Sequence, residues 1–280
     1  MTKEFVFRHS SRLTFSFLII STLLVACFTK DTSTFPTSTS IQETALPANS
    51  IRLANGEWPP YNSTNLPHGG CDSWVVEESF ALQGINVEYE FFPWARSYIL
   101  SSTGVFDGTL AWADTPEHRD QHFISQEPTT IQEWVFFFRT DQPFVYSSMA
   151  DLEGKTVGIT AGYVYSDAFI DLQDDDTIQF IASSSDEANF QMLLAGRIDV
   201  FPMERNVGLL LISSLFSEDE QNQISLTPNS FAQFQTHLLL SKAVESNRER
   251  MGLFNTGFQQ LKESGRYDQI LQQCKTQYSQ

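Results

Sequence analysis

Two kinds of apolar segment alternate along the chain from residue 51 onward, and this alternation constrains the fold more than any other feature. Some segments are short apolar or alternating runs, as in strands, and others carry apolar residues at helical spacing, as at Trp74, Val75 and Leu82. The expected strands are 51–54, 87–92, 109–112, 134–138, 156–160, 178–181, 198–201 and 237–240. The expected helices are 71–82, 94–100, 164–172, 185–194, 206–215, 244–263 and 266–275. The order predicts an α/β fold.

Composition limits the partners and the metal chemistry. With 280 residues, 41% of them hydrophobic, the chain is long enough for about two domains with sizeable cores. The formal net charge of −17 repels phosphate backbones, so nucleic acid is not an expected partner. Three cysteines without a C-x-x-C spacing predict neither structural zinc nor a disulfide scaffold.

The N-terminus is typical of an export signal. Lys3, Arg8 and Arg12 precede an uncharged, mostly apolar run over 13–26, which is too short for a comfortable membrane span. The run ends in LVAC, which resembles the lipobox of bacterial lipoproteins. The resemblance implies cleavage after residue 26 and attachment of lipid, including palmitate, to Cys27. The alternative is an ordinary secretory signal with a chance cysteine.

The segment that follows reads as a tether. Residues 27–49 are rich in Ser and Thr and lack apolar periodicity, so we expect a flexible link between an anchored Cys27 and a folded head. The head would face the periplasm or the cell exterior. By resemblance to known lipoproteins, Phe28 after the lipidated cysteine favours the outer membrane of a Gram-negative cell, which leaves the choice of membrane open.

Five blocks resemble the family 3 extracellular solute-binding proteins, in that family's order and over about residues 50–276. The blocks are NGEWPPY at 55–61, FDG at 106–108 leading to TPE at 115–117 and IS at 124–125, DLEGKTVG at 151–158 with Gly162, LLAGRIDV at 193–200, and KESG at 262–265.

This resemblance implies a two-lobed periplasmic-binding-protein fold of type II, hinged by two crossing strands near 128–132 and 230–235. Lobe 1 would be residues 50–127 plus 236–280, and lobe 2 would be 128–235. Such a monomer would capture a small polar, amino-acid-like solute between the lobes, without a cofactor, and deliver it to an ABC importer.

Three aromatic residues are candidate walls of the ligand site. Trp58 and Tyr61 follow the first expected strand and flank a Pro-Pro pair that stiffens the loop, and Trp112 ends the third strand. A rigid aromatic wall can cover an apolar side chain or lie over a cation. The alternative for each is a place in the core.

The expected anion end of the site departs from the family pattern. The family usually places an Arg after Thr-Pro-Glu, but here His118 stands at that position, with Arg119 next and with Asp114 and Thr115 at the same mouth. Three alternatives follow: Arg119 takes the role, His118 takes it when charged, or the ligand lacks an α-carboxylate.

Further candidates come from both lobes. Arg96 stands at the start of an expected helix, where a cation is unfavourable without a partner. Gly162 and Tyr163 lead into an expected helix whose free amides suit an anion. Glu204 falls where the family carries an acid for the ligand ammonium. The alternatives are solvent-exposed or helix-capping roles.

The sequence also bears on two rival functions and on one crosslink. The chain has no G-x-S-x-G, Walker, G-x-G-x-x-G or H-E-x-x-H motif, and His118 and His122 at i, i+4 lack an evident third metal ligand, so neither an enzyme nor a metal site is expected. A binding module that reports to a membrane receptor is the main rival to transport. Cys71 and Cys274 would both lie in lobe 1, where an oxidising space allows a disulfide between them.

Overall fold

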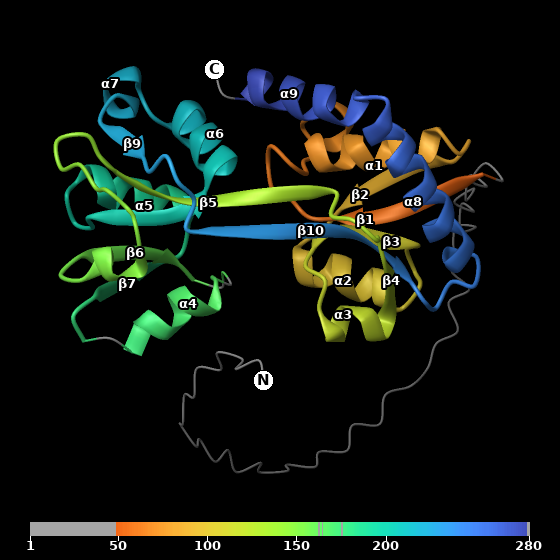
Figure 1. Ribbon diagram of the computed structural model, residues 1–280, viewed down its shortest axis with the longest axis horizontal. Helices are drawn as coiled ribbons and strands as arrows, with labels where there is room; N and C mark the ends of the chain where they lie inside the picture. The colour runs from red at the N-terminus through yellow and green to blue at the C-terminus, as the bar shows by residue number, and fades with distance from the viewer. Residues whose placement is uncertain (1–48, 162, 164, 175, 279–280) are drawn as a thin grey trace, which may run out of the picture. The chain divides into compact units, whose positions relative to one another are not determined.

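The computed structural model confirms the α/β alternation and describes residues 49–161, 163, 165–174 and 176–278 (Figure 1). The described residues belong to one compact unit. The strands are β1 Ser50–Asn55, β2 Asn86–Phe91, β3 Gly108–Trp112, β4 His122–Ile124, β5 Thr130–Arg139, β6 Thr156–Thr160, β7 Gln179–Ser183, β8 Val200–Glu204, β9 Ile224–Leu226 and β10 Ala232–Ser241. The α-helices are α1 Cys71–Ala81, α2 Trp94–Ser102, α3 Pro116–Gln121, α4 Asp167–Ile170, α5 Asp186–Leu194, α6 Arg205–Leu215, α7 Glu218–Gln221, α8 Asn247–Glu263 and α9 Arg266–Tyr278. Three short 3₁₀ helices complete the described elements: Pro67–Gly69, Met149–Leu152 and Asp171–Asp174.

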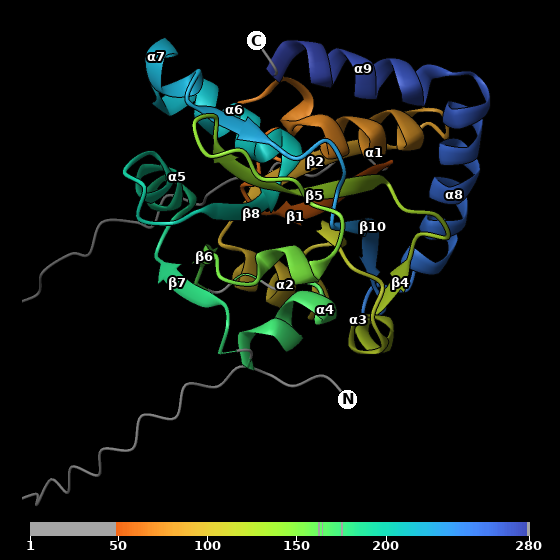
Figure 2. The ribbon, with the colours of Figure 1, turned by 60° about the vertical axis from the view of Figure 1, so that its left-hand side comes forward.

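The sheet is continuous but falls into two halves. Its strand order is β2-β1-β3-β10-β5-β8-β6-β7, with β4 paired to β10 and β9 paired to β5. Strand β10 serves both halves, because residues 232–236 pair with β5 whereas residues 237–241 pair with β3 and β4. We use lobe 1 for the side of β1 to β4 and lobe 2 for the side of β6 to β9. Figures 1 and 2 show β5 and β10 running side by side from one lobe to the other.

Strand β5 lies at the centre of the hydrophobic core. Residues 134–138, an unbroken apolar run, are all buried, as expected for a strand covered on both faces. Val135 and Phe137 join a core that extends into lobe 1, whereas Trp134, Phe136 and Phe138 pack into a second, mainly aromatic core of lobe 2. Alternate side chains of one strand therefore hold both cores together.

The structure differs from the sequence expectation around residues 164–172. Instead of one helix, it has a single turn of α4, Asp167–Ile170, followed by a 3₁₀ turn, Asp171–Asp174. The segment 171–176 contains four aspartates, a residue type that favours turns over helix interiors. The buried side chain of Phe169 anchors α4 to the rest of the protein. Strands β4 and β9 were not predicted, because three residues carry too little periodicity.

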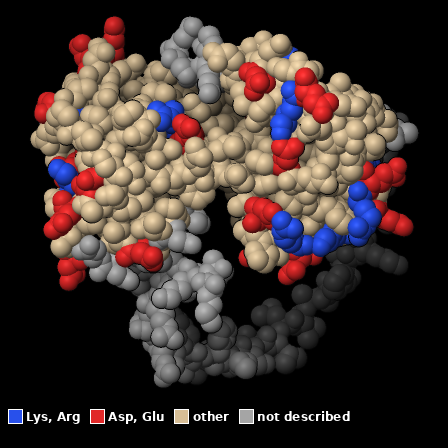
Figure 3. All heavy atoms as spheres, viewed as in Figure 1, with Lys and Arg blue, Asp and Glu red and all other residues tan. Residues whose placement is uncertain are grey.

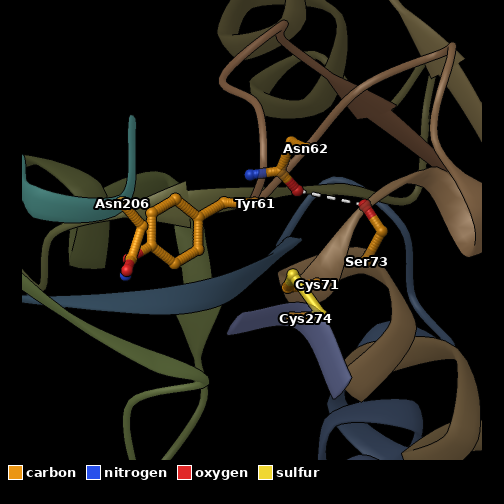
Figure 4. Close-up of a disulfide and its surroundings, with 6 residues drawn as sticks. All are labelled: Tyr61, Asn62, Cys71, Ser73, Asn206 and Cys274. Carbon is orange, nitrogen blue, oxygen red and sulfur yellow. Dashed lines mark hydrogen bonds between the residues drawn. A yellow bond between two sulfur atoms is a disulfide. The ribbon is translucent and has the colours of Figure 1, made fainter. Parts of the chain in front are cut away.

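A disulfide joins Cys71, the first residue of α1, to Cys274 in α9, with the two Cα atoms 6.0 Å apart (Figure 4). This is the pair that the sequence suggested. The expected signal segment 1–26 and all of the expected tether 27–49 except Asn49, Cys27 included, lie outside the described residues. No helix in the described part of the chain is both long and apolar enough to span a bilayer.

Candidate functional site

A cavity of about 240 Å³ opens where the two lobes meet strand β5. Its lining is mostly aromatic and comes from both lobes and from β5: Trp58, Trp94, Ala111, Trp112, Gln132, Trp134 and Tyr163. Four of the five tryptophans in the chain are therefore gathered here. None of the seven described residues in this lining carries a charge. Figure 3 shows a notch between the lower parts of the two lobes, with charged side chains at its right-hand rim.

Trp58 stands on a closed loop after β1. The amide of Trp58 donates to the carbonyl oxygen of Asn62 at 2.7 Å, and the amide of Tyr61 donates back to the carbonyl oxygen of Trp58 at 2.9 Å. These bonds fix the loop, so the indole of Trp58 reaches across to lobe 2. There it meets the Tyr163 ring edge to face, with centroids 5.6 Å apart.

Trp94, the first residue of α2, packs directly on the glycine of the same loop. A methyl group placed on Gly56 would lie 2.3 Å from two atoms of the indole, so the position tolerates no side chain unless Trp94 moves. The indole Nε1 of Trp94 donates to the carbonyl oxygen of Glu57 at 3.3 Å. Its ring meets that of Trp112 edge to face at 5.7 Å.

A bulge in β3 sets the direction of Trp112. Residues 109 and 112 of β3 oppose residues 239 and 237 of β10, so β3 carries one extra residue. Ala111 has a φ of 62°, a left-handed backbone that residues other than glycine seldom adopt. Bulges commonly redirect a side chain next to a binding site. Here the indole of Trp112 lines the cavity, and its Nε1 donates to Oγ1 of Thr109 at 3.0 Å.

His118 lies behind this wall and not in it. Its ring contacts those of Trp112 and Tyr98, with centroid distances of 5.4 and 5.3 Å, and its Nδ1 lies 2.6 Å from the carbonyl oxygen of Ala113. Thr115 caps the helix α3 by accepting a hydrogen bond from the amide of His118 at 3.2 Å. Thr115 and His118 therefore fix the backbone of the segment that follows Trp112.

The lobe 2 wall is Tyr163 and Trp134. The Tyr163 hydroxyl donates to Asp186 at 2.6 Å, and the Thr160 hydroxyl donates to the other oxygen of the same carboxylate at 2.6 Å. Trp134 is 5% exposed, and its Nε1 has no hydrogen-bond partner among the described residues. A buried N–H without a partner is costly, so this atom is available to an acceptor.

Tyr61 and Glu204 meet beside the cavity and not inside it. The Tyr61 hydroxyl donates to Oε1 of Glu204 at 2.8 Å and accepts from Nδ2 of Asn206 at 2.8 Å; Figure 4 shows Asn206 beside the phenol. Glu204 also caps α6 by accepting from the amide of Val207 at 2.8 Å. Burial raises the pKa of Glu204 to about 7 against the lowering effect of these donors. The contact ties a lobe 1 loop to the first turn of a lobe 2 helix.

The cations predicted for the anion end are engaged elsewhere. Arg119 pairs with Asp114 through two contacts, and 65% of its side chain is exposed. The guanidinium of Arg96 lies 4.9 Å from the centroid of the Phe92 ring on an exposed face. Neither lines the cavity, and Gly162 lies outside the described residues. Ligand contacts of Arg96, Arg119 and Gly162 therefore stay predictions.

The cavity thus unites Trp58, Trp112 and Tyr163 from the predicted set with four residues that sequence reasoning missed: Trp94, Ala111, Gln132 and Trp134. Trp94 and Trp134 each begin an expected helix or strand, and no pattern in the sequence marks either of them as a cavity residue. No group of three or more potential metal ligands occurs within the described ranges.

Neither a scan of protein-family profiles nor a search of curated sequences finds a match. Solved structures do match. A histidine kinase sensor domain with similarity to periplasmic binding proteins has a TM-score of 0.62 and 18% identity, over 80% of this chain and 95% of its own. An ancestral arginine-binding protein bound to arginine has a TM-score of 0.61 and 19% identity, over 80% and 97%.

A third match is the amino acid ABC transporter substrate-binding protein AbpA from Streptococcus pneumoniae, bound to L-arginine. It has a TM-score of 0.60 and 16% identity, over 83% of this chain and 97% of its own. At these identities the comparison establishes the architecture. The chain has the two-lobed α/β fold of periplasmic binding proteins, with β5 and β10 as the strands that cross between the lobes.

Proposed function

We propose that this protein is a solute-binding protein that captures a small polar solute between its two lobes without changing it chemically. The observation that carries the proposal is the cavity lined by side chains of both lobes and of the strand that connects them. Ligands of two-lobed folds lie between domains, where closure excludes water. Several structural neighbours are described as amino-acid-binding proteins, which supports an amino-acid-like solute.

The remaining elements of the proposal concern the whole chain. Lobe 1 comprises residues 50–127 plus 236–280, lobe 2 comprises 128–235, and the protein acts as a monomer. Residues 1–26 direct export, lipid on Cys27 anchors the protein, and residues 27–49 link the anchor to the head. The ABC-transporter neighbours support delivery to an importer.

A second candidate is ligand sensing, because one neighbour is a histidine kinase sensor domain. The two functions use the same binding event and differ in the membrane partner. Crosslinking the ligand-loaded protein in its native membrane and identifying the partner distinguishes them: a permease supports transport, and a receptor kinase or cyclase supports sensing.

The test of binding is a panel of amino acids, amines and organic acids, read by thermal unfolding of the purified protein. A ligand at 100 times its Kd stabilises the folded state by about 2.7 kcal/mol. The matched variant is Trp112→Ala, which removes one wall and should abolish the shift. A panel without any shift, repeated by isothermal titration, contradicts the proposal.

The lipid anchor has its own test. Growth with a palmitate analogue should label the wild-type protein and leave Cys27→Ser unlabelled and released from the membrane fraction. An unlabelled wild-type protein whose mature chain starts elsewhere rules the anchor out.

A further inference from the structure

The walls of the cavity offer aromatic faces in several directions and no ionised group. The ring pairs Trp58–Tyr163, Trp94–Trp112 and Trp134–Tyr163 meet at interplanar angles of 73°, 82° and 77°. Rings at such steep angles cannot stack on one another, so the lining presents aromatic surfaces in different orientations. We call this open, aromatic-lined cavity the aromatic box.

Two of these walls are held in place before any ligand arrives. The indole N–H groups of Trp94 and Trp112 are bonded to Glu57 and Thr109, and Gly56 and the bulge at Ala111 fix where the two rings lie. Preorganised walls bind without ordering side chains at the moment of binding.

The box suits a cation better than a zwitterion. The face of an aromatic ring carries negative potential and attracts cations within about 6 Å, most strongly for tryptophan. The hydroxyl of Tyr163 donates to the Asp186 carboxylate, which raises the electron density of that ring. The net charge of the chain, −17, also favours the approach of a cation.

A carboxylate, in contrast, finds no charged partner in the lining. Arg119 is paired with Asp114, Arg96 lies over Phe92, and His118 is packed behind Trp112. A buried carboxylate without a cation is costly. The polar groups in the lining include the amide of Gln132 and the unpartnered Nε1 of Trp134, and both are neutral.

On the basis of the proposed function, we infer that the ligand is a small methylated ammonium cation without an obligatory carboxylate. Methyl groups on the nitrogen match walls that are apolar and aromatic, and they remove the N–H donors that a primary ammonium would leave unsatisfied in this box. A hydroxyl on the ligand would accept from Trp134.

The first experiment is isothermal titration of the purified full-length protein with choline and with 3,3-dimethylbutan-1-ol, which has the same shape and no charge. We expect choline to bind at least about 10-fold more tightly, because the two differ in the cation–π attraction. Equal affinities overturn the inference.

L-arginine and L-glutamine in the same titration separate this inference from the proposed function. If an amino acid binds and choline does not, the ligand class is wrong and solute binding stands. If nothing in the wider panel binds, the proposed function itself fails.

The second experiment lowers the electron density of the tryptophan rings and leaves the fold unchanged. Biosynthetic replacement of tryptophan by 5-fluorotryptophan places four of the five fluorinated residues in the box. The fifth, Trp74, stacks on His68 outside the box, and a Trp74→Phe background removes it. We expect choline affinity to fall several-fold on fluorination while the affinity for 3,3-dimethylbutan-1-ol is nearly unchanged. An equal change for both ligands contradicts a cation–π site.

Discussion

The hydroxyl of Tyr61 donates a 2.8 Å hydrogen bond to Oε1 of Glu204, although the two residues are 143 positions apart and belong to different lobes. Both side chains are buried, with exposures of 6% and 0%. The hydroxyl also accepts from Asn206. Removing it would therefore leave a buried acceptor and a donor without a partner at the same point.

Tyr61→Phe should lower the free energy of unfolding by about 1–3 kcal/mol, the cost of leaving buried polar groups unpaired. The measurement is urea unfolding followed by circular dichroism. Tyr98→Phe is the matched control, because the Tyr98 hydroxyl has no partner among the described residues and its loss should be nearly neutral. Equal losses in the two variants would show that the bond to Glu204 contributes nothing specific.

Stability should fall as the pH rises from 6.5 to 8.5. Burial raises the pKa of Glu204 and that of Asp72 to about 7, whereas both groups titrate near 4 in an unfolded chain. A raised folded-state pKa contributes stability that is fully present below pH 4 and is lost as the pH passes 7. Together with the opposing effect of two buried histidines, we expect a net loss of about 1 kcal/mol over this window, measured as the free energy of unfolding at each pH.

The buried histidines offset part of this loss. Burial lowers the pKa of His122 to about 4 and also lowers the pKa of His237, whereas histidine in an unfolded chain titrates near 6.5. The two histidines therefore oppose the carboxyls up to about pH 7.5, where the unfolded chain has lost these protons. Glu204→Gln should remove about half of the carboxyl contribution to the pH dependence of the free energy of unfolding above pH 6.5. An unchanged slope in that variant assigns the pH dependence to other groups.

Gly56→Ala should displace the indole of Trp94. The added methyl group would overlap the ring, and overpacking of this kind costs about 1–3 kcal/mol. Because Trp94 lines the cavity, affinity for the ligand should fall at least about 10-fold, as measured by titration of tryptophan fluorescence. Gly252→Ala is the control: this position in α8 has open space around it, so both stability and affinity should be kept. Unchanged affinity in Gly56→Ala would mean that Trp94 is not part of the site.

Loss of the Cys71–Cys274 disulfide should destabilise the protein by up to about 5 kcal/mol, the value that the chain-entropy estimate gives for a loop of this length. Wild-type protein should melt at a lower temperature in reductant, whereas the Cys71→Ala, Cys274→Ala double variant should melt equally with and without it. Two reactive thiols in the unreduced wild-type protein would contradict the bridge.

Much of the fold could be predicted because apolar residues recur at a different spacing in its helices than in its strands. The run 134–138 predicts a strand covered on both faces, and β5 is one. The helical spacing of Trp74, Val75 and Leu82 predicts α1, which the structure places at residues 71–81. These features depend on residues that are close together in the sequence, so the sequence alone is enough to predict them.

The site was harder to predict because it depends on distant partners. Nothing near Gly56 in the sequence shows that Trp94 covers it, and nothing in β3 shows that Ala111 takes a left-handed backbone. Trp134 looks like any first residue of an apolar strand, yet it lines the cavity. Trp58 and Trp112 could be found because they stand in a loop and at the end of a strand, and Tyr163 because it precedes an expected helix.

The disulfide turns residues 71–274 into a covalent ring, and both passages of the chain between the lobes lie within it. A protease that cuts once within lobe 2, or once in β5 or β10, therefore leaves two pieces that cannot separate until the bridge is reduced. Outside a cell, where proteases are common and reductants are scarce, a nicked molecule would keep both halves of its binding site.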